Sequence, residues 1–580
     1  MSQIWLKGMD DVMAKRKITG ICLLLGLLML AGWIQMVKAC EPYQEQEIAF
    51  SLKDSFYSED QELILSTLLD ADIYYTMDGS LPAEGAMRYE EPIKLTAGEE
   101  LKAVPIRAVA CYEGGESSPI YTKTYFLGKQ AEERFSTKIV SITGDPEDFY
   151  DYDRGILVPG RIRDAYAMAN PDEDFTDTAP ANYNLRGMES ERPIYAEIWD
   201  ADGTCLVSQN MGMRVHGGTS RGNDMKSLRL IARKDYGEKR ISQELFLNNS
   251  SDWTGNPITE YKQVILRNHG NDHEKAYLRN ELGQRLARDA GFLDTQEFCA
   301  ASVWLNGQYY GFEWMEESYD DVYFQTHYGT KNDEGSWQVL APHRGSANIY
   351  TEDEAEAQAA WDFNIAYGYL LRDLTDDSIF AELEQQLDID NFLQYCAIEI
   401  YLSNPDWPNN NCKAYRWYAN GRNYNGPYLD GRWRFLLYDL DVGMARTGSS
   451  MADNPTLGEV LREEESNWDR EEPLLRALLQ REDMRKRFTE IMENMMEGAF
   501  SYEHACQVID EIQQEMEGEL EYQISLIAEK KAQEFAGAEE ASQYQKSVYE
   551  EEIEKIKEFF RLRPEVMQKE LMRLSSPSPE

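Results

Sequence analysis

The chain has 580 residues, with 58 Lys and Arg against 104 Asp and Glu, and a formal net charge of −46 at pH 7. This length exceeds what one hydrophobic core ordinarily fills, so we expect two or three domains. The acidic charge is spread along the chain and repels polyanions, which argues against nucleic acid as a partner. Divalent cations or basic substrates would suit such a surface, and so would simple solvation.

The N-terminus predicts a membrane anchor. Lys15-Arg16-Lys17 precedes an apolar run, Ile18–Val37, about as long as a helix needs to cross a bilayer. A cleavable signal has a shorter apolar core, so residues 1–41 are expected to form a cytoplasmic basic segment and an uncleaved transmembrane helix. The basic flank predicts a single-pass protein of the cell membrane with the bulk of the chain extracellular. A lipobox at 37–40 is the alternative, and it predicts the same sidedness.

Cysteine and histidine argue against two kinds of site. The eight cysteines have wide, irregular spacings with no CxxC pair, which argues against a zinc ribbon or a thioredoxin-like centre. The six histidines form no HExxH motif. Any metal is therefore expected to be held by oxygen.

Residues 47–127 predict a small β-sandwich. Short β-rich runs alternate with turns at Asp78-Gly79 and Gly114-Gly115. The segment IYYTMDGSLP from Ile73 and the closing run SSPIYTKTYF resemble the chitobiase C-terminal-like module. The resemblance implies an accessory domain that contacts cell-wall glycan or, alternatively, a stalk that lifts the next domain from the membrane.

Residues 138–500 mix strand and helix signals. Ile194–Trp199 and Met213–Ile231 alternate like strands, whereas Tyr277–Ala290 has apolar residues at helical spacing. The fold class expected is therefore α+β. Because the sandwich has its own strand pattern, a fragment starting near Lys138 is expected to fold by itself.

Residues 501–575 predict a helical C-terminal extension. Apolar residues recur every four positions amid Glu and Gln at Val508, Ile512, Met516 and Leu520. A second such stretch runs from Val548 to Leu562. The two are expected to form a cap or hairpin on the preceding domain.

A glycine-rich segment is the first candidate for chemistry. Gly217 and Gly218, followed by Ser220 and Arg221, can turn backbone N–H groups toward phosphate oxygens, and Lys226 follows on the next predicted strand. The segment lacks the GxxxxGK[ST] pattern of a Walker A motif. Taken alone, it suits a flexible hairpin equally well.

The stretch NPDWPNNN is the second candidate. Asp406 and Asn411 have the spacing that protein kinases use in the catalytic loop, where the Asp orients the attacking hydroxyl and the Asn helps to hold Mg²⁺. The pattern is common by chance and also suits an ordinary turn.

The third candidate is WRFLLYDLDVGMA, an apolar strand that ends in Asp439 and Asp441. Buried carboxylates need a cation or a donor network. Asp441-Val442-Gly443 imitates the DFG element whose Asp chelates Mg²⁺. In a strand, Asp439 and Asp441 would face the same side, where they could share one metal or divide the work between the metal and a structural donor.

The order of these three segments resembles the CotH (spore coat protein H) kinase family. The similarity runs from about Ile139 to Ala445 and includes GGTSRGNDMKSLRL, LRNHGNDHEKAYLRNELGQRLARDAG and NGQYYGFEWMEES. The resemblance implies an atypical protein kinase domain that uses ATP and Mg²⁺ (or Mn²⁺).

Carried over residue by residue, the resemblance makes Asp406 catalytic, Asn411 and Asp441 metal ligands with Asp439, and Lys226 the phosphate-binding lysine. Glu317 would support Lys226 or the nucleotide. Matching positions whose role is either structural or substrate-binding are Arg267, Asn268 and Arg279. Three departures put the substrate in doubt rather than the chemistry: Val442 after DLD, Asn280 after Arg279, and His216 in place of Arg.

The function expected is an extracytoplasmic kinase that phosphorylates Ser or Thr of secreted or cell-surface proteins. One alternative is a non-catalytic surface protein, structural or carbohydrate-binding, on the same fold. A glycosidase is a second alternative, but two carboxylates so close in sequence suit a metal better than a sugar cleft.

Overall fold

The computed structural model describes residues 47–575 except 84–85, 174–175, 177, 330–334, 344, 352, 420–427 and 463–469. Within these residues no helix is both long and apolar enough to span a membrane. The predicted anchor at Ile18–Val37 lies outside the described residues.

The N-terminal module is all β, as its turn spacing predicted. A five-stranded sheet in the order β2-β9-β8-β5-β6 is accompanied by the two-stranded sheets β1-β4 and β3-β7. Its core includes Ile48, Leu63, Ile106 and Tyr125. The strands are β1 Ile48–Phe50, β2 Phe56–Tyr57, β3 Gln61–Leu63, β4 Leu65–Thr67, β5 Ala71–Thr76, β6 Met87–Arg88, β7 Ile93–Leu95, β8 Lys102–Tyr112 and β9 Tyr121–Leu127.

A closed barrel of seven strands follows, in the order β10-β11-β12-β13-β14-β16-β15. Parallel pairing of β10 with β15 closes it. Alternate residues such as Leu228, Leu230, Val264 and Leu266 fill its interior, and their neighbours face outward. The strands are β10 Lys138–Gly144, β11 Arg192–Trp199, β12 Cys205–Val215, β13 Leu228–Ile231, β14 Gln263–Arg267, β15 Phe298–Leu305 and β16 Gln308–Glu317.

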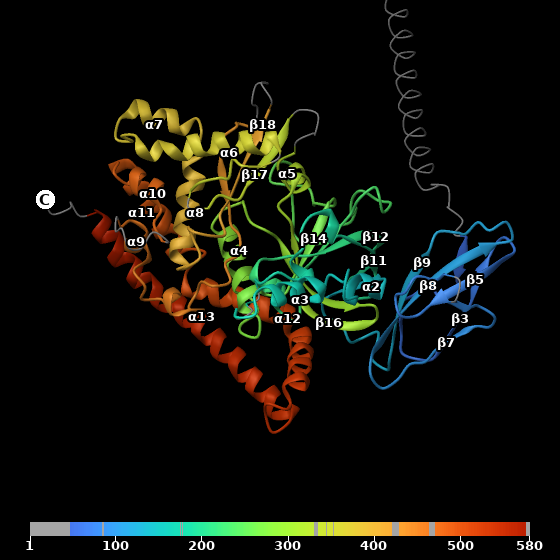
Figure 1. Cartoon of the computed structure of the whole chain (residues 1–580). Helices are drawn as coiled ribbons and strands as arrows, with labels where there is room; N and C mark the ends of the chain where they lie inside the picture. The colour runs from blue at the N-terminus through green and yellow to red at the C-terminus, as the bar shows by residue number, and fades with distance from the viewer. Residues whose placement is uncertain are drawn as a thin grey trace, which may run out of the picture.

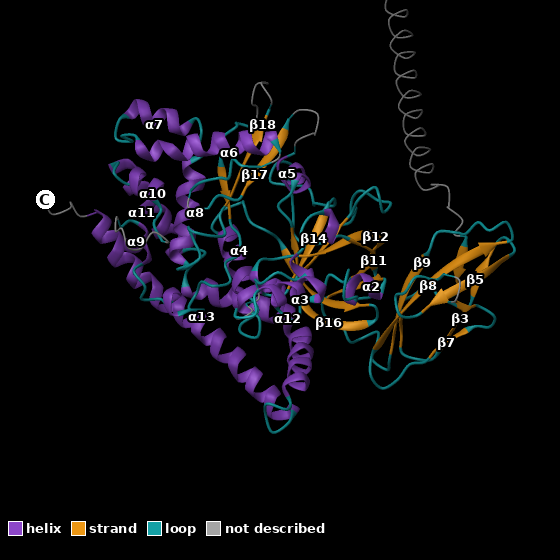
Figure 2. Ribbon diagram, in the orientation of Figure 1, coloured by secondary structure: helices purple, strands orange, loops and turns teal. Residues whose placement is uncertain are grey.

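Helices and a three-stranded sheet, β17-β18-β19, form a second body beside the barrel (Figures 1 and 2). The sheet strands are β17 Ser336–Leu340, β18 Lys413–Tyr418 and β19 Arg434–Leu436. The short helices α2 Pro146–Tyr150 and α3 Gly160–Ala169 lie against the barrel (Figure 1). The other helices are α4 Arg279–Asp289, α5 Asp321–Tyr328, α6 Glu354–Tyr367, α7 Asp377–Glu384, α8 Ile389–Tyr401, α9 Thr456–Val460, α10 Pro473–Leu478, α11 Glu482–Glu497, α12 Tyr502–Lys531 and α13 Ala538–Ser575. The predicted mixed α+β fold with a helical C-terminal region is confirmed.

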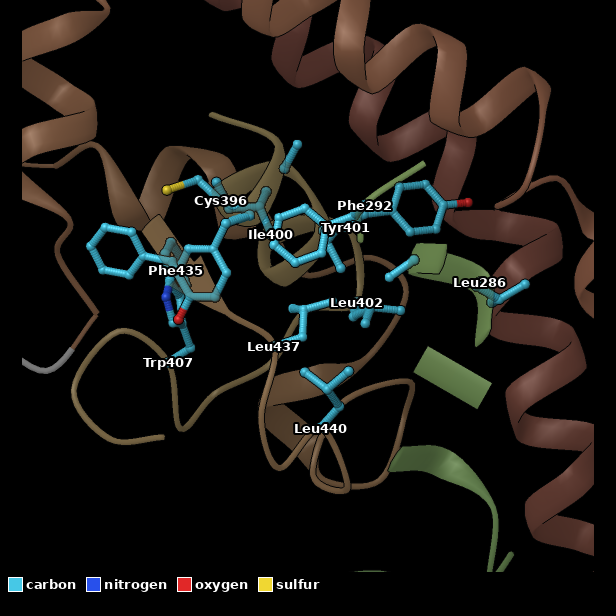
Figure 3. Packing of buried hydrophobic residues seen from close by; sticks show 14 of the residues in the cluster. Leu286, Phe292, Cys396, Ile400, Tyr401, Leu402, Trp407, Phe435, Leu437 and Leu440 are labelled. Atoms are coloured by element: carbon cyan, nitrogen blue, oxygen red, sulfur yellow. The ribbon is translucent and has the colours of Figure 1, made fainter. Parts of the chain in front are cut away.

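The largest core lies under the loops that follow α8 and β19. Side chains of α8, including Cys396, Ile400 and Tyr401, gather with Leu437 and Leu440 (Figure 3). These residues are fully buried, so the backbone on either side of them has little freedom to shift. The core thus supports the two segments in which DxxxxN and DxD occur.

The C-terminal helices are part of this body. α12 and α13 are joined at the tip of a long hairpin (Figure 1) and contribute Ile512, Met516, Ile556 and Phe560 to the same core. Arg563 of α13 is fully buried, and its guanidinium donates to the carbonyls of Ile400, Tyr401, Ala452 and Asn454. The extension therefore closes the C-terminal end of α8, where unsatisfied carbonyls need donors.

The module and the barrel share an apolar contact. Phe126 of β9 stacks on Phe56, with ring centroids 4.9 Å apart, and meets Trp199 and Trp304 of the barrel edge-on at 5.7 and 5.3 Å. Beside the rings, the backbone N–H of Thr124 donates to buried Glu197 at 2.9 Å. The N-terminal module and the barrel therefore pack through a defined interface.

Candidate functional site

Asp439 and Asp441 converge on one guanidinium. Nη2 of Arg267, at the end of β14, donates to Asp439 Oδ1 at 2.7 Å and to Asp441 Oδ2 at 2.6 Å. The backbone N–H of Asn271 donates to Asp441 Oδ2 at 2.9 Å, and its side-chain amide donates to Oδ1 at 3.1 Å. Asp441 is almost fully buried, whereas the side chain of Asp439 is 27% exposed.

The strand that was expected to align these aspartates is shorter than predicted. β19 ends at Leu436, and Asp439 has a left-handed backbone, with φ of 60°. The side chains meet because the loop folds back on Arg267, and not because they alternate along a strand. Asn411 has the same kind of backbone, with φ of 56°. Asn and Asp accept this conformation more readily than other non-glycine residues, and such positions gather at functional sites.

A glycine makes the approach of Asp441 possible. Gly270 has φ of 55°, and a Cβ atom there would lie 2.0 Å from Asp441 Oδ2. Any side chain at this position would displace the carboxylate. The segment HGND before α4 is therefore shaped to receive the aspartate from the other body of the domain.

Asp406 is held by a chain of polar contacts that begins in α8. Buried Glu399 accepts a hydrogen bond from Asn404 Nδ2 at 2.9 Å, and Asn404 Oδ1 accepts one from the backbone N–H of Asp406 at 3.1 Å. Asn411 Nδ2 donates to Asp406 Oδ2 at 3.4 Å. The predicted pair of Asp406 and Asn411 is thus brought into contact.

The carboxylates of the site repel one another. Burial, followed by the charges of Asp441 and Asp406, raises the pKa of Asp439 to about 7, although Arg267 opposes the shift. Burial and the charge of Asp441 also raise the pKa of Asp406. Burial raises the pKa of Glu399 to about 8, with contributions from Asp406 and Asp439. Asp406 and Asp439 therefore lie within electrostatic range of each other, of Asp441 and of Glu399.

The site offers oxygen ligands to a hard cation. Within the described part of the chain, no three His, Cys, Asp or Glu side chains form a preassembled metal-binding group. The donors that fit Mg²⁺ are the carboxylates of Asp439 and Asp441 and the amide oxygen of Asn411. A divalent cation would relieve the repulsion that raises the pKa of Asp439, so the residues present fit the metal.

Glu316, and not Glu317, faces this site. Glu316 Oε1 lies 3.7 Å from Arg267 Nε and accepts a hydrogen bond from Asn280 at 3.0 Å. Next to it, burial and the charge of Glu316 raise the pKa of Glu281 well above its usual value.

Glu317 is one residue further along β16 and points into the barrel. There it accepts hydrogen bonds from Asn249 Nδ2 at 2.8 Å and from the backbone N–H of Glu297 at 3.1 Å, and it contacts His327 at 3.2 Å. This strand register places Glu317 on the face opposite Glu316, and its expected role beside the nucleotide stays a prediction. Sequence reasoning missed that the residues of the run WMEES alternate between the two faces of a strand, so that the two adjacent glutamates point in opposite directions.

The glycine-rich segment forms a turn between β12 and β13. Gly217 has φ of 99°, and Ser220 and Arg221 lie in a short 3₁₀ helix, Thr219–Gly222, that follows Gly218. The guanidinium of Arg221 donates to the carbonyls of Val215, Gly217 and Tyr183 at 2.7 to 2.8 Å. Arg221 therefore holds the turn together through these carbonyls, and its predicted contact with a nucleotide stays a prediction.

Lys226 is buried beside this turn. Its Nζ donates to the carbonyl of Asn223 at 2.7 Å and lies 4.4 Å from the ring centre of Tyr183. The nearby Asn268, a matching position of the family, bridges Ser227 and the carbonyl of Met225. The contacts of Asn268 are those of a structural residue.

Arg279 is structural as well. At the start of α4 it pairs with Asp272, donates to the carbonyl of Met444 at 3.3 Å, and pairs with Glu552 of α13 at 2.8 Å. It thereby links α4, the loop after Asp441 and the C-terminal helices. Of the three matching positions, Arg267 alone contacts the aspartates.

Two family models match the chain. A model described as Fn3 associated covers residues 63–125, within the module predicted as chitobiase C-terminal-like. A model described as CotH kinase protein covers residues 213–567 and includes α12 and most of α13. None of the curated proteins compared with the chain matches it. Because the second model spans more than half of the chain and contains every aspartate of the site, the protein belongs to the CotH kinase family.

Proposed function

We propose that this protein is an ATP- and Mg²⁺-dependent protein kinase that phosphorylates Ser or Thr of secreted or cell-surface proteins. The observation that carries the proposal is that the pair of Asp406 and Asn411 lies within electrostatic range of the pair of Asp439 and Asp441, with the order and spacing that phosphoryl transfer uses. Family membership supports the kinase-like fold.

Each side chain has a task that follows from its position. Asp406 orients the acceptor hydroxyl and takes its proton, and its raised pKa makes the carboxylate a stronger base than a free Asp. Asn411, Asp439 and Asp441 would hold Mg²⁺, which when bound neutralises phosphate charge. Arg267 keeps the two aspartates together and balances their charge.

The direct test is phosphate transfer. Full-length protein purified in detergent is incubated with labelled ATP and Mg²⁺ or Mn²⁺, and labelled Ser or Thr is sought in the protein itself. Asp406→Asn is the matched control. Absence of transfer from folded wild-type protein with either metal would favour the non-catalytic alternative.

The proposed location is the outer face of the cell membrane, with one helix at Ile18–Val37 as the anchor. The basic residues before this run support the orientation. Protease added to intact cells should remove the ectodomain. Full protection of the ectodomain would place the domain inside the cell instead.

A further inference from the structure

Two cations near the aspartates have no carboxylate partner. Among the described residues, the guanidinium of Arg229 forms a hydrogen bond only with Nδ1 of His216, at 2.7 Å, and Nζ of Lys413 forms no hydrogen bond or ion pair but lies near the rings of Tyr319 and Tyr438. Lys413 Nζ instead lies 3.4 Å from the ring centre of Tyr438, the residue before Asp439. In a chain with a net charge of −46, basic side chains without a carboxylate partner at a candidate site indicate an anionic ligand.

The strand register places Arg229 on the face of the barrel that carries the site. Arg229 is paired with Ile265 of β14, and Ile265 is paired with Glu316 of β16. Arg267 lies two residues after Ile265, so its side chain emerges on this same outer face. Arg229, Arg267 and Glu316 therefore line one surface.

Lys413 approaches from the opposite body. It is the first residue of β18 and follows Asn411 after one residue. Lys413 lies within electrostatic range of Arg229, Asp439 and Glu316. His216 also lies close to both side chains, because its pKa is held well below the usual value first by burial and then by the charges of Arg229 and Lys413. The neutral ring of His216 can thus accept from Arg229 and orient its guanidinium.

Cations from both bodies meet beside a set of oxygen ligands for a metal. This combination suits a phosphate chain, whose oxygens bind cationic donors directly and reach a divalent cation at the same time. We propose that Arg229 and Lys413 bind the phosphate chain of the nucleotide, the task that sequence resemblance gives to Lys226. The inference rests on the proposed function, and names the residues that recognise its phosphate donor.

The test measures binding of ATP and of inorganic tripolyphosphate, each with Mg²⁺, to full-length protein in detergent. Arg229→Met and Lys413→Met should each weaken both ligands roughly tenfold or more, because each removes a charge-assisted hydrogen bond. Adenosine, which has no phosphate, should bind these variants and the wild-type protein equally. Melting temperatures without ligand show that the variants are folded.

Matched controls remove cations elsewhere. Lys486→Met and Arg561→Met act on side chains that are 78% and 56% exposed, and both variants should bind ATP as the wild-type protein does. If a Met variant does not fold, Arg229→Lys and Lys413→Arg keep the charge. Arg229→Lys should weaken tripolyphosphate binding less than tenfold, because lysine lacks the planar fork of arginine but retains its charge.

The outcomes separate this inference from the proposed function. If wild-type protein transfers phosphate while folded Arg229 and Lys413 variants bind both ligands normally, or if only Lys226→Met loses binding, the inference is overturned and the function stands. If wild-type protein binds tripolyphosphate through Arg229 and Lys413 without transferring phosphate, the inference stands and the function fails. Wild-type protein that binds neither ligand would overturn both.

Discussion

Arg267 is the side chain on which the two aspartates after β19 depend. The spacing of DxxxxN and DxD predicted that Asp406, Asn411, Asp439 and Asp441 act together, and the structure brings the two pairs within electrostatic range of each other. Spacing alone could not show which cation balances them, because Arg267 belongs to the barrel and precedes Asp441 by 174 positions.

Glu316 and Glu317 show a second limit at this scale. Adjacent residues of a strand face opposite sides, so a shift of one position exchanges the barrel interior for the face that carries the candidate site. Resemblance to a family motif names the segment, whereas the side chain that reaches the site depends on the register of β16 with β14.

The aspartates can be tested separately. Asp441→Asn should lower phosphate transfer by about 100-fold or more, because it removes charge where the transition state needs it. It should also abolish the Mg²⁺-dependent thermal shift with ATP. Asp406→Asn should stop transfer but keep most of that thermal shift, since its task concerns the hydroxyl. Normal turnover and thermal shift in Asp441→Asn would assign the metal to Asp439 or contradict the kinase proposal.

His327 gives the barrel a pH-dependent contact. Burial opposes its charge, but Glu317 and Asp252 outweigh burial and raise the pKa of His327 from 6.5 to about 9. The stabilisation is therefore complete below about pH 6.5 and is lost as pH rises through about 9. His327→Gln should lower the melting temperature most near pH 6.5 and least above pH 9. His504→Gln, at the surface, is the control, and a constant difference across this range would contradict the assignment.

At the scale of elements, periodicity predicted the helices well and the strand ends poorly. Tyr277–Ala290 contains α4, and the four-residue repeat after Val508 lies in α12. The stretch from Trp433 looked like one long strand because it is apolar throughout. Its apolar residues after Leu436 are instead buried in a loop, where Leu437 and Leu440 enter the core. Apolar residues that are buried in a loop, outside a hydrogen-bonded sheet, follow no regular period in the sequence.

α13 should be needed to position the loop that carries Asp406. Arg563→Met leaves four carbonyls at the end of α8 and after it without their donor, and three of these hydrogen bonds are buried. We expect a loss of about 3 kcal/mol or more in the free energy of unfolding, measured in denaturant. Phosphate transfer should fall more than the folded fraction does.

The control for this change is Lys569→Met, on an exposed face of α13. It should leave both stability and transfer as in the wild-type protein. Equal stability of Arg563→Met and wild-type protein would show that water replaces the guanidinium at no cost.

At the scale of the whole molecule, neither the closure of the barrel nor its contact with the module could be read from the sequence. Closure depends on pairing between β10 and β15, which are separated by more than a hundred residues. The contact depends on Phe126, Trp199 and Trp304, which belong to three separate strands. Long-range pairings of this kind leave no local pattern.

The interface between module and barrel affects the stability expected of a fragment that starts at Lys138. Such a fragment contains the whole barrel and is still expected to fold, but without the module it exposes Trp199 and Trp304. Its melting temperature and solubility should therefore be lower than those of a chain that starts at residue 47.

Phe126→Ala in the full chain should reproduce part of this effect. It should lower the free energy of unfolding by about 3–5 kcal/mol, because the ring is fully buried. Met87→Ala, on exposed β6, is the control. Equal melting temperatures for the Lys138 fragment and the longer chain would show that the interface adds nothing to the barrel.

The position of Arg563 has a consequence for the order of events during synthesis. The residues of the candidate site are complete once Asp441 has left the ribosome, yet the donor that fixes the end of α8 belongs to a helix made much later. A nascent chain that has not reached α13 contains all the acidic groups of the site but lacks Arg563, which holds the end of α8 in place. We expect such a chain to be inactive, so that competence for phosphate transfer is acquired in one step when the C-terminal helices dock.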